Sequence, residues 1–106
     1  MRGPMLELRP NCEMCDKDLP PDAPDARICS YECTFCTTCV DDVLQNVCPN
    51  CGGGFVPRPI RPKGAHRTGT GLAHHPAGSK RRHLKWEIDD LRDHVAALKG
   101  IAPADR

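Results

Sequence analysis

Eight cysteines, all between positions 12 and 51, constrain this chain of 106 residues more than any other feature. They form four close pairs, each with two or three residues between its members. The pairs are Cys12 and Cys15, Cys29 and Cys33, Cys36 and Cys39, and Cys48 and Cys51. Two such pairs supply the four thiolates of one tetrahedral zinc. Four pairs therefore predict two structural zinc ions, with no ligand left over.

The region that carries the cysteines is too short to be stabilised by a hydrophobic core alone. We expect a zinc domain over residues 5–56, and domains of about 40–50 residues usually need metals, disulfides or a partner. Aromatic residues are scarce in the whole chain, which has two Phe, one Tyr and one Trp. Structural zinc contributes roughly 10–16 kcal/mol of apparent binding free energy in small domains. The sequence therefore predicts a small, metal-stabilised α+β fold.

Disulfides and an iron–sulfur cluster are the alternative uses of the cysteines. Disulfides require an oxidising compartment, and the first ten residues contain no apolar stretch of signal-peptide length. No run reaches transmembrane length either, so we expect a cytoplasmic, reduced protein without a membrane partner. A ferredoxin-like run, made of Cys33, Cys36, Cys39 and Cys48, would suit an iron–sulfur cluster. That cluster leaves the other four cysteines unused, whereas zinc uses all eight.

The four pairs can be combined around two zincs in a sequential or an interleaved order. Sequential sites would crowd Cys33 and Cys36 into one turn shared by both ions. In the interleaved order, or cross-brace, each ion joins segments that flank the ligands of the other, which predicts one compact unit. We favour this cross-brace, which uses Cys12, Cys15, Cys36 and Cys39 for one zinc, and Cys29, Cys33, Cys48 and Cys51 for the other.

A few short elements are expected around the metals. Residues 16–27 are rich in Pro and Asp and predict an irregular loop, whereas residues 28–31 predict a strand. Apolar residues at helical spacing over 40–47 predict a helix of two turns. Residues 55–56 are expected to pair back as a closing strand.

The character of the chain changes after residue 56. Residues 57–79, with many Pro, Gly and basic residues, predict a flexible linker, and residues 80–99 predict an amphipathic C-terminal helix. Residues 1–56 carry four Lys or Arg against nine Asp or Glu, and residues 57–106 carry eleven against five. An acidic head with a basic tail is unlike a nucleic-acid-binding zinc finger, whose basic residues lie on the finger itself.

Five apolar residues of the predicted helix follow heptad spacing: Leu84, Ile88, Leu91, Val95 and Leu98. β-branched residues at the a positions with Leu at the d positions favour parallel dimers, so a homodimer through residues 84–98 is one interpretation. The other is that the stripe packs on the zinc head of the same chain. Two heptads are too few to indicate a coiled coil, so both interpretations stay open.

The complete cysteine spacing resembles a RING finger in which a cysteine replaces the usual histidine ligand. Apolar residues next to the ligands extend the resemblance: Met14, Phe35 and Pro49. More closely, residues 5–62 resemble the small bacterial family catalogued as domain of unknown function 1272. That resemblance implies a RING-like fold with two zincs and no agreed activity. It also implies that Met5 is the natural initiator and that residues 1–4 are an upstream extension.

The RING resemblance implies a docking groove for a protein partner. In RING-type ubiquitin ligases the matching surface receives a conjugating enzyme, and its candidates here are Met14, Val43, Leu44 and Pro49. The alternative is that these residues belong to the small core. Gly52 stands where such ligases often carry a cationic residue, which argues against ligase activity. We expect a protein–protein interaction module or small regulatory adaptor, with a ubiquitin-like ligase docking module as the alternative.

No catalytic centre is expected, so the chain is not predicted to be an enzyme. Catalytic zinc keeps an open position and often has His or carboxylate ligands, whereas all five histidines lie beyond residue 65. Four histidines could capture metal, although exposed histidines are usually just solvated: His66, His74, His75 and His83. The basic cluster at 80–85 leaves nucleic-acid binding as a further alternative. Such clusters more often attract an acidic partner, here including the head itself.

Overall fold

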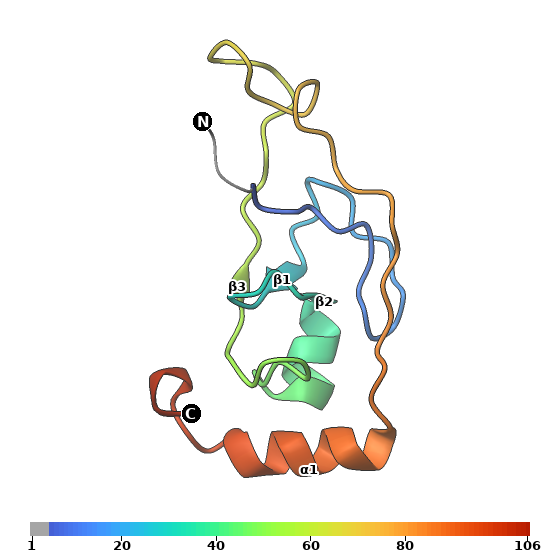
Figure 1. Ribbon diagram of the computed structural model, residues 1–106, viewed down its shortest axis with the longest axis vertical. Helices are drawn as coiled ribbons and strands as arrows, with labels where there is room; N and C mark the ends of the chain where they lie inside the picture. Colours follow the sequence, from blue (N-terminus) through green and yellow to red (C-terminus); the bar gives the residue numbers. More distant parts are fainter. Residues whose placement is uncertain (1–4) are drawn as a thin grey trace.

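The computed structural model describes residues 5–106, and the expected upstream extension, residues 1–4, lies outside the described residues. The elements are, in order, β1 (Ala26–Ile28), β2 (Thr34–Cys36), the π-helix η1 (Cys39–Leu44), β3 (Val56–Pro57), α1 (Ile88–Leu98) and the 3₁₀-helix η2 (Pro103–Asp105). The sheet and η1 lie in the middle of an elongated molecule, and α1 crosses one end of it (Figure 1). The predicted α+β class is confirmed.

β1 is the central strand of a small antiparallel sheet in the order β2-β1-β3. Arg27 is paired with Phe35 on one side and with Pro57 on the other. Pro57 is tolerated because β3 is an edge strand, where a missing N–H group interrupts no further pairing. The closing strand predicted at 55–56 therefore forms, shifted by one residue.

The strand predicted at 28–31 lies at 26–28 instead. The Cys29 N–H group donates to the Cys33 carbonyl at 3.2 Å, and Glu32 between them has a positive φ of 66°. This turn brings the second cysteine pair together and ends the strand at Ile28. The loop predicted over 16–27 is accordingly wrong at its C-terminal end, where residues 26 and 27 belong to β1.

The helix predicted over 40–47 forms as η1, which ends earlier, at Leu44. Gln45 and Asn46 follow with positive φ of 48° and 62°, and both of their N–H groups donate to the Val40 carbonyl. Asn visits this left-handed region more easily than most residues do. The reversal turns Val47 back into the core, where it is fully buried, and leads the chain into Cys48.

The core around the sheet is small and is built largely from sulfur. Six of the eight cysteines are buried. The largest core side chain is Phe35, which is fully buried and meets Phe55 edge-on with ring centroids 5.4 Å apart. Leu44 and Val47 fill the space next to them. Such a core is consistent with a domain whose stability depends on bound metal.

The tail differs from its prediction at the start of the helix. α1 begins at Ile88, whereas the sequence predicts a helix from residue 80. Residues 58–87 contain no helix or strand in the described chain, and residues 80–87 lie alongside the head (Figure 1). There the N–H groups of Arg82 and Leu84 donate to Asn11 and Glu13. These bonds to the head replace the intrahelical bonds that a longer helix would form.

Among the described residues, no helix combines the length and the apolar character that crossing a membrane requires.

Candidate metal centre

The first group of sulfur atoms has the spacing of a tetrahedral metal site. It consists of Cys12, Cys15, Cys36 and Cys39, whose Sγ atoms all lie within 4.8 Å of one another. Cys15 Sγ and Cys36 Sγ are 3.7 Å apart. Four sulfurs around one zinc lie about 3.8 Å apart when each Zn–S bond is about 2.3 Å. These are the four cysteines that the sequence assigns to the first zinc, and their geometry fits that ion.

The second group contains three of the four cysteines predicted for the other zinc. Cys29, Cys33 and Cys48 are buried, and their Sγ atoms lie within 4.8 Å of one another. Cys51 is exposed and lies outside the group. Its Sγ nevertheless accepts the Gly53 N–H at 3.4 Å, just as Cys29 Sγ accepts the N–H two residues later at 3.3 Å. Cys51 thus lies on a turn like that of Cys29, and its role as a fourth ligand stays a prediction.

Tight turns and the sheet position the ligands. Cys12 and Cys15 lie on a turn closed by the Cys12 carbonyl, which accepts the Asp16 N–H at 2.9 Å. Cys36 is the last residue of β2, and Cys39 is the first residue of η1. The Glu13 N–H donates to the Thr34 carbonyl of β2 at 2.9 Å, which attaches the turn of the first pair to the strand that ends at Cys36 and explains why two distant segments meet in the first group.

Gly52 closes the turn that carries Cys48 and Cys51. It has a positive φ of 79°, and its N–H donates to the Cys48 carbonyl at 2.8 Å. A Cβ atom at this position would meet Leu98 Cδ1 of α1 at 3.0 Å. Glycine is favoured here by backbone conformation and by the close approach of α1. The cationic residue that is common at this position in RING-type ligases would be strained and would press against the helix.

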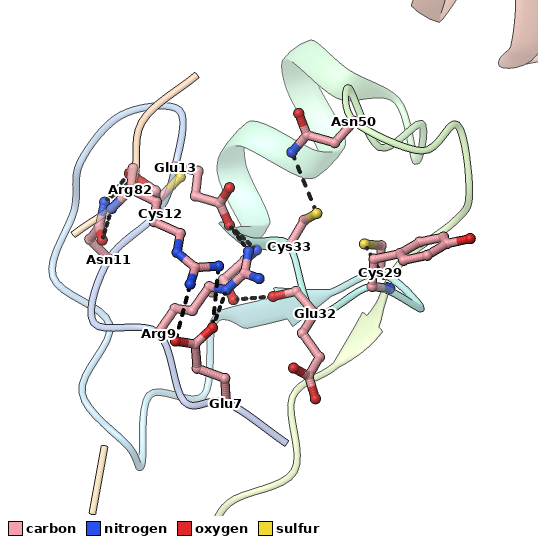
Figure 2. A network of polar contacts seen from close by, with 12 residues as sticks. Glu7, Arg9, Asn11, Cys12, Glu13, Cys29, Glu32, Cys33, Asn50 and Arg82 are labelled. Carbon is pink, nitrogen blue, oxygen red and sulfur yellow. Dashed lines mark hydrogen bonds and ion pairs between the residues drawn. The ribbon is translucent and has the colours of Figure 1, made fainter. Parts of the chain in front are cut away.

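The clustered thiols differ strongly in acidity. Hydrogen bonds with Cys33 and Cys48 lower the pKa of Cys29 to about 3, whereas hydrogen bonds with Cys29 and Cys33 raise the pKa of Cys48. Burial raises the pKa of Cys39, and the charge of Cys12 raises it further. Cys33 Sγ also accepts a hydrogen bond from Asn50 Nδ2 at 3.4 Å (Figure 2). Such sulfurs compete for protons, and a soft dication that binds them as thiolates removes this competition.

Of the four residues predicted to line a docking groove, two are buried and two lie at the surface beneath α1. Leu44 is fully buried, so the core alternative holds for it, and Pro49 is buried as well. Met14 is half-buried and Val43 is 40 % exposed. These two side chains line a groove of about 500 Å³ whose other wall is α1. The predicted partner surface therefore faces a helix of the same chain.

The heptad stripe faces the head in this structure. Leu91 and Val95 are 3 % and 4 % exposed and belong to the core of the head. Leu84 and Leu98 are half-buried and pack against the same core, while Ile88 stays 50 % exposed. The stripe thus packs within its own chain, as one of the two interpretations expects. A homodimer through residues 84–98 stays a prediction, and it would require the helix to leave the head.

A network of buried polar residues next to the first cysteine pair was missed by sequence reasoning. Glu13 Oε2 accepts the Thr34 N–H at 2.6 Å and Arg9 Nη1 at 3.0 Å, which connects the N-terminal segment to β2 (Figure 2). The Asn11 side chain is fully buried and is bonded to Arg82 of the tail. The sequence signal that could have identified Asn11 and Glu13 is that they flank Cys12, because residues next to metal ligands often form the hydrogen bonds that support a metal site.

Arg58 is a second residue that the sequence did not single out. It falls in the predicted linker, yet it is only 4 % exposed. Its guanidinium donates to the carbonyls of Arg9, Leu19 and Pro20 at 2.8, 3.1 and 2.9 Å. Burial lowers the pKa of Arg58, although an arginine side chain remains charged. Arg58 thereby joins the chain after β3 to the first loops of the head.

The linker histidines are not gathered into a candidate metal site. In the part of the chain that the structure describes, groups of three or more potential ligands are confined to the two cysteine groups. His75 Nε2 lies 3.1 Å from the Gly69 carbonyl, and His83 Nδ1 lies 3.8 Å from an Asp16 carboxylate oxygen. The alternative of metal capture by these histidines gains no support from their placement.

Comparisons with known proteins identify the cysteine-rich half. An uncharacterized protein of Rhizobium meliloti (strain 1021) is 64% identical over 58 residues, which is 55% of this chain and 69% of that protein. No solved structure matches. A model of the family described as "Protein of unknown function (DUF1272)" matches residues 5–61, which include all eight cysteines. The chain therefore belongs to the DUF1272 family, as the sequence resemblance predicts.

Proposed function

We propose that this protein is a RING-like, two-zinc interaction module that acts as a small regulatory adaptor without catalysis of its own. The observation that carries the proposal is the alternation of the two sulfur groups along the chain. Segments near residues 12 and 36 supply one group, and segments near 29 and 48 supply the other. Two ions bound in this cross-braced order hold a single rigid surface, which is what a docking module needs.

A structural role for zinc follows from the ligands. Four thiolates saturate the first ion and leave no position for a substrate or an activated water. The second ion reaches the same state when Cys51 joins Cys29, Cys33 and Cys48 as its fourth ligand. The protein then has metal-dependent shape and no metal-centred chemistry.

The alternatives receive less support from the arrangement of the tail. A conjugating enzyme would have to reach Met14 and Val43, which face α1 across the groove. A nucleic acid would have to compete for Arg81 and Arg82, which already form ion pairs with Asp16, Asp18 and Glu7. We therefore place the protein with interaction modules that bind other proteins.

Elemental analysis joined to a binding experiment tests this proposal. Protein purified without added metal should contain two zincs per chain and should be colourless. Zinc-loaded full-length protein, fixed on a support, should retain a defined partner from the extract of its own host. The matched control is the Cys36→Ser protein, which should retain nothing. A single zinc per chain, visible iron–sulfur absorption, or equal retention by both baits would contradict the proposal.

A further inference from the structure

Residues 81–98 lie on the head in the way that a bound peptide lies on a receptor. The contacts fall into three consecutive parts: two cations on an acidic rim, an extended stretch bonded through its backbone, and an amphipathic helix on an apolar surface. This segment is connected to β3 by residues 58–80, which contain no helix or strand in the described chain.

The acidic rim is formed by the loop that follows the first cysteine pair and by the N-terminal segment. Arg81 Nη1 lies 2.7 Å from Asp18 Oδ1, and Arg81 Nη2 lies 2.9 Å from Asp16 Oδ1 and donates to the Asp16 carbonyl. Arg82 Nη1 lies 3.3 Å from Glu7 Oε1. Two adjacent cations therefore form ion pairs with three carboxylates of the head.

The extended stretch is recognised through its backbone. Asn11 Nδ2 donates to the Arg82 carbonyl at 2.8 Å, and Asn11 Oδ1 accepts the Arg82 N–H at 3.2 Å. The Leu84 N–H then donates to the Glu13 carbonyl at 2.8 Å. A primary amide that pairs with both polar groups of one residue fixes the register of a peptide without selecting its side chains. Asn11 Nδ2 also donates to the Cys12 carbonyl and to Asp16 Oδ1, both at 3.1 Å, and these bonds within the head hold the amide in place for such a partner.

The helical part is recognised by shape and apolar contact. Trp86 Nε1 donates to Asn50 Oδ1 at 2.8 Å and marks the start of α1. Leu91 and Val95 then insert into the core of the head beside η1. Helices that present apolar residues at this spacing to a groove are a recurrent mode of peptide recognition.

We propose that the head is a receptor for a segment of a partner protein that carries two adjacent cations in extended conformation followed by an amphipathic helix, and that residues 81–98 are its resident competitor. The inference rests on the proposed interaction function and specifies its partner. Charge complementarity selects this occupant: residues 1–56 carry nine acidic side chains against four basic ones, and a basic segment is what they attract.

The tether makes the competition quantitative. Covalent attachment through residues 58–80 gives the tail a high effective concentration at the head, on the order of 1 mM for a short flexible connection. A partner segment of equal intrinsic affinity is therefore masked when the tail is docked, and it binds when the tail is released. Modification or binding of the basic cluster at 80–85 would release the tail and expose the receptor surface.

A synthetic peptide of residues 79–99, labelled with fluorescein, is the probe. It is titrated by fluorescence anisotropy against zinc-loaded full-length protein and against a full-length open variant, Arg81→Glu with Leu91→Asp, which cannot dock its own tail. We expect the open variant to bind the peptide at least about tenfold more tightly than the unmodified protein, and binding to weaken as salt is added. Equal affinity for both proteins, or no binding to the open variant, would overturn the inference.

Charge exchange provides the matched control. Asp18→Lys in the open variant changes a side chain that is 82% exposed, so the head should keep its fold and its zinc. The Asp18→Lys substitution should lower the affinity for the unmodified peptide and restore binding of a peptide with Arg81→Glu. Failure of that exchange would overturn the assignment of the acidic rim.

Two further measurements separate this inference from its rivals. A mass of two chains for the unmodified protein in solution, lost in the open variant, would identify the occupant as the tail of a second copy and would overturn the competitor proposal. Elemental analysis of every variant reports separately on the proposed zinc scaffold. Two zincs in the open variant without peptide binding would reject the receptor alone, whereas fewer than two zincs in the unmodified protein would reject the proposed function.

Discussion

Residues 5–57 and residues 80–106 lie against each other, yet different forces hold them. In the head, short strands and turns surround two groups of sulfur, and the apolar side chains are few. In the tail, one helix and an extended stretch carry no metal ligand of either group and are attached by apolar contacts, ion pairs and hydrogen bonds. In the proposed two-zinc state, metal coordination would act over the whole head at once, whereas the contacts of the tail can be removed one by one. The head should therefore unfold as a unit and the tail should detach separately.

The largest effect is expected from losing a ligand of the first group. Cys36→Ser should unfold the entire head, because this group joins the N-terminal turn to β2 and η1 and because structural zinc contributes roughly 10–16 kcal/mol. Proton NMR of the zinc-loaded protein would show collapse of the dispersed amide signals. Survival of a folded half would indicate sequential rather than cross-braced sites.

Cys51→Ser should affect folding less than Cys36→Ser does, which distinguishes the second metal site of the head from the first. Cys51 is exposed and lies outside the second sulfur group. We expect the head to stay folded with one zinc bound tightly, while the affinity of the second site falls by more than about tenfold. Competition with a chromophoric chelator measures both sites. Unchanged affinity of both would remove Cys51 from the ligands.

Arg58→Met tests a metal-independent contact of the head. The substitution keeps most of the side-chain volume and removes donors to three backbone carbonyls. Loss of these charged hydrogen bonds should lower the free energy of unfolding by about 3 kcal/mol at constant zinc activity. Urea denaturation measures this, with exposed Arg67→Met as the control. A change below about 0.5 kcal/mol would show that Arg58 is dispensable.

Leu91→Ala should affect the tail and leave the head intact. Leu91 is 3 % exposed in the core, so its truncation should destabilise docking of α1 by about 2–3 kcal/mol. Ile88→Ala, at a side chain that is 50 % exposed, is the matched control and should have little effect. Emission of Trp86, the one tryptophan of the chain, reports docking, and elemental analysis reports the metal. Loss of zinc from Leu91→Ala would contradict the separation of the two regions.

Sequence reasoning performed best where chemistry fixes spacing. The cysteine pattern predicted the membership of the first group and three members of the second, because two ligands with two or three residues between them can reach one ion from one turn. It placed η1 and the closing strand within a few residues. It failed at element ends, such as Ile28 and Leu44, where turns that bring ligands together override local propensity.

Contacts between distant segments could not be predicted in the same way. Arg58 looks like one more basic residue in a Pro-rich stretch, and its burial depends on three carbonyls supplied by other loops. Asn11 carries no local signature for its bonds to Arg82. The charge asymmetry left contact between the basic cluster and the acidic head as one option, and the ion pair of Arg81 with Asp18 is such a contact.

Gly52 couples the turn of the last cysteine pair in the head to the position of α1 in the tail, and the sequences of relatives can test this coupling. A hydrogen atom in place of a side chain is what lets Leu98 approach the turn of the last cysteine pair. Proteins of the family in which this glycine is replaced by a larger residue should therefore lack the C-terminal helix or carry it elsewhere. Sequence variation at one position would then report which members keep the proposed receptor surface covered.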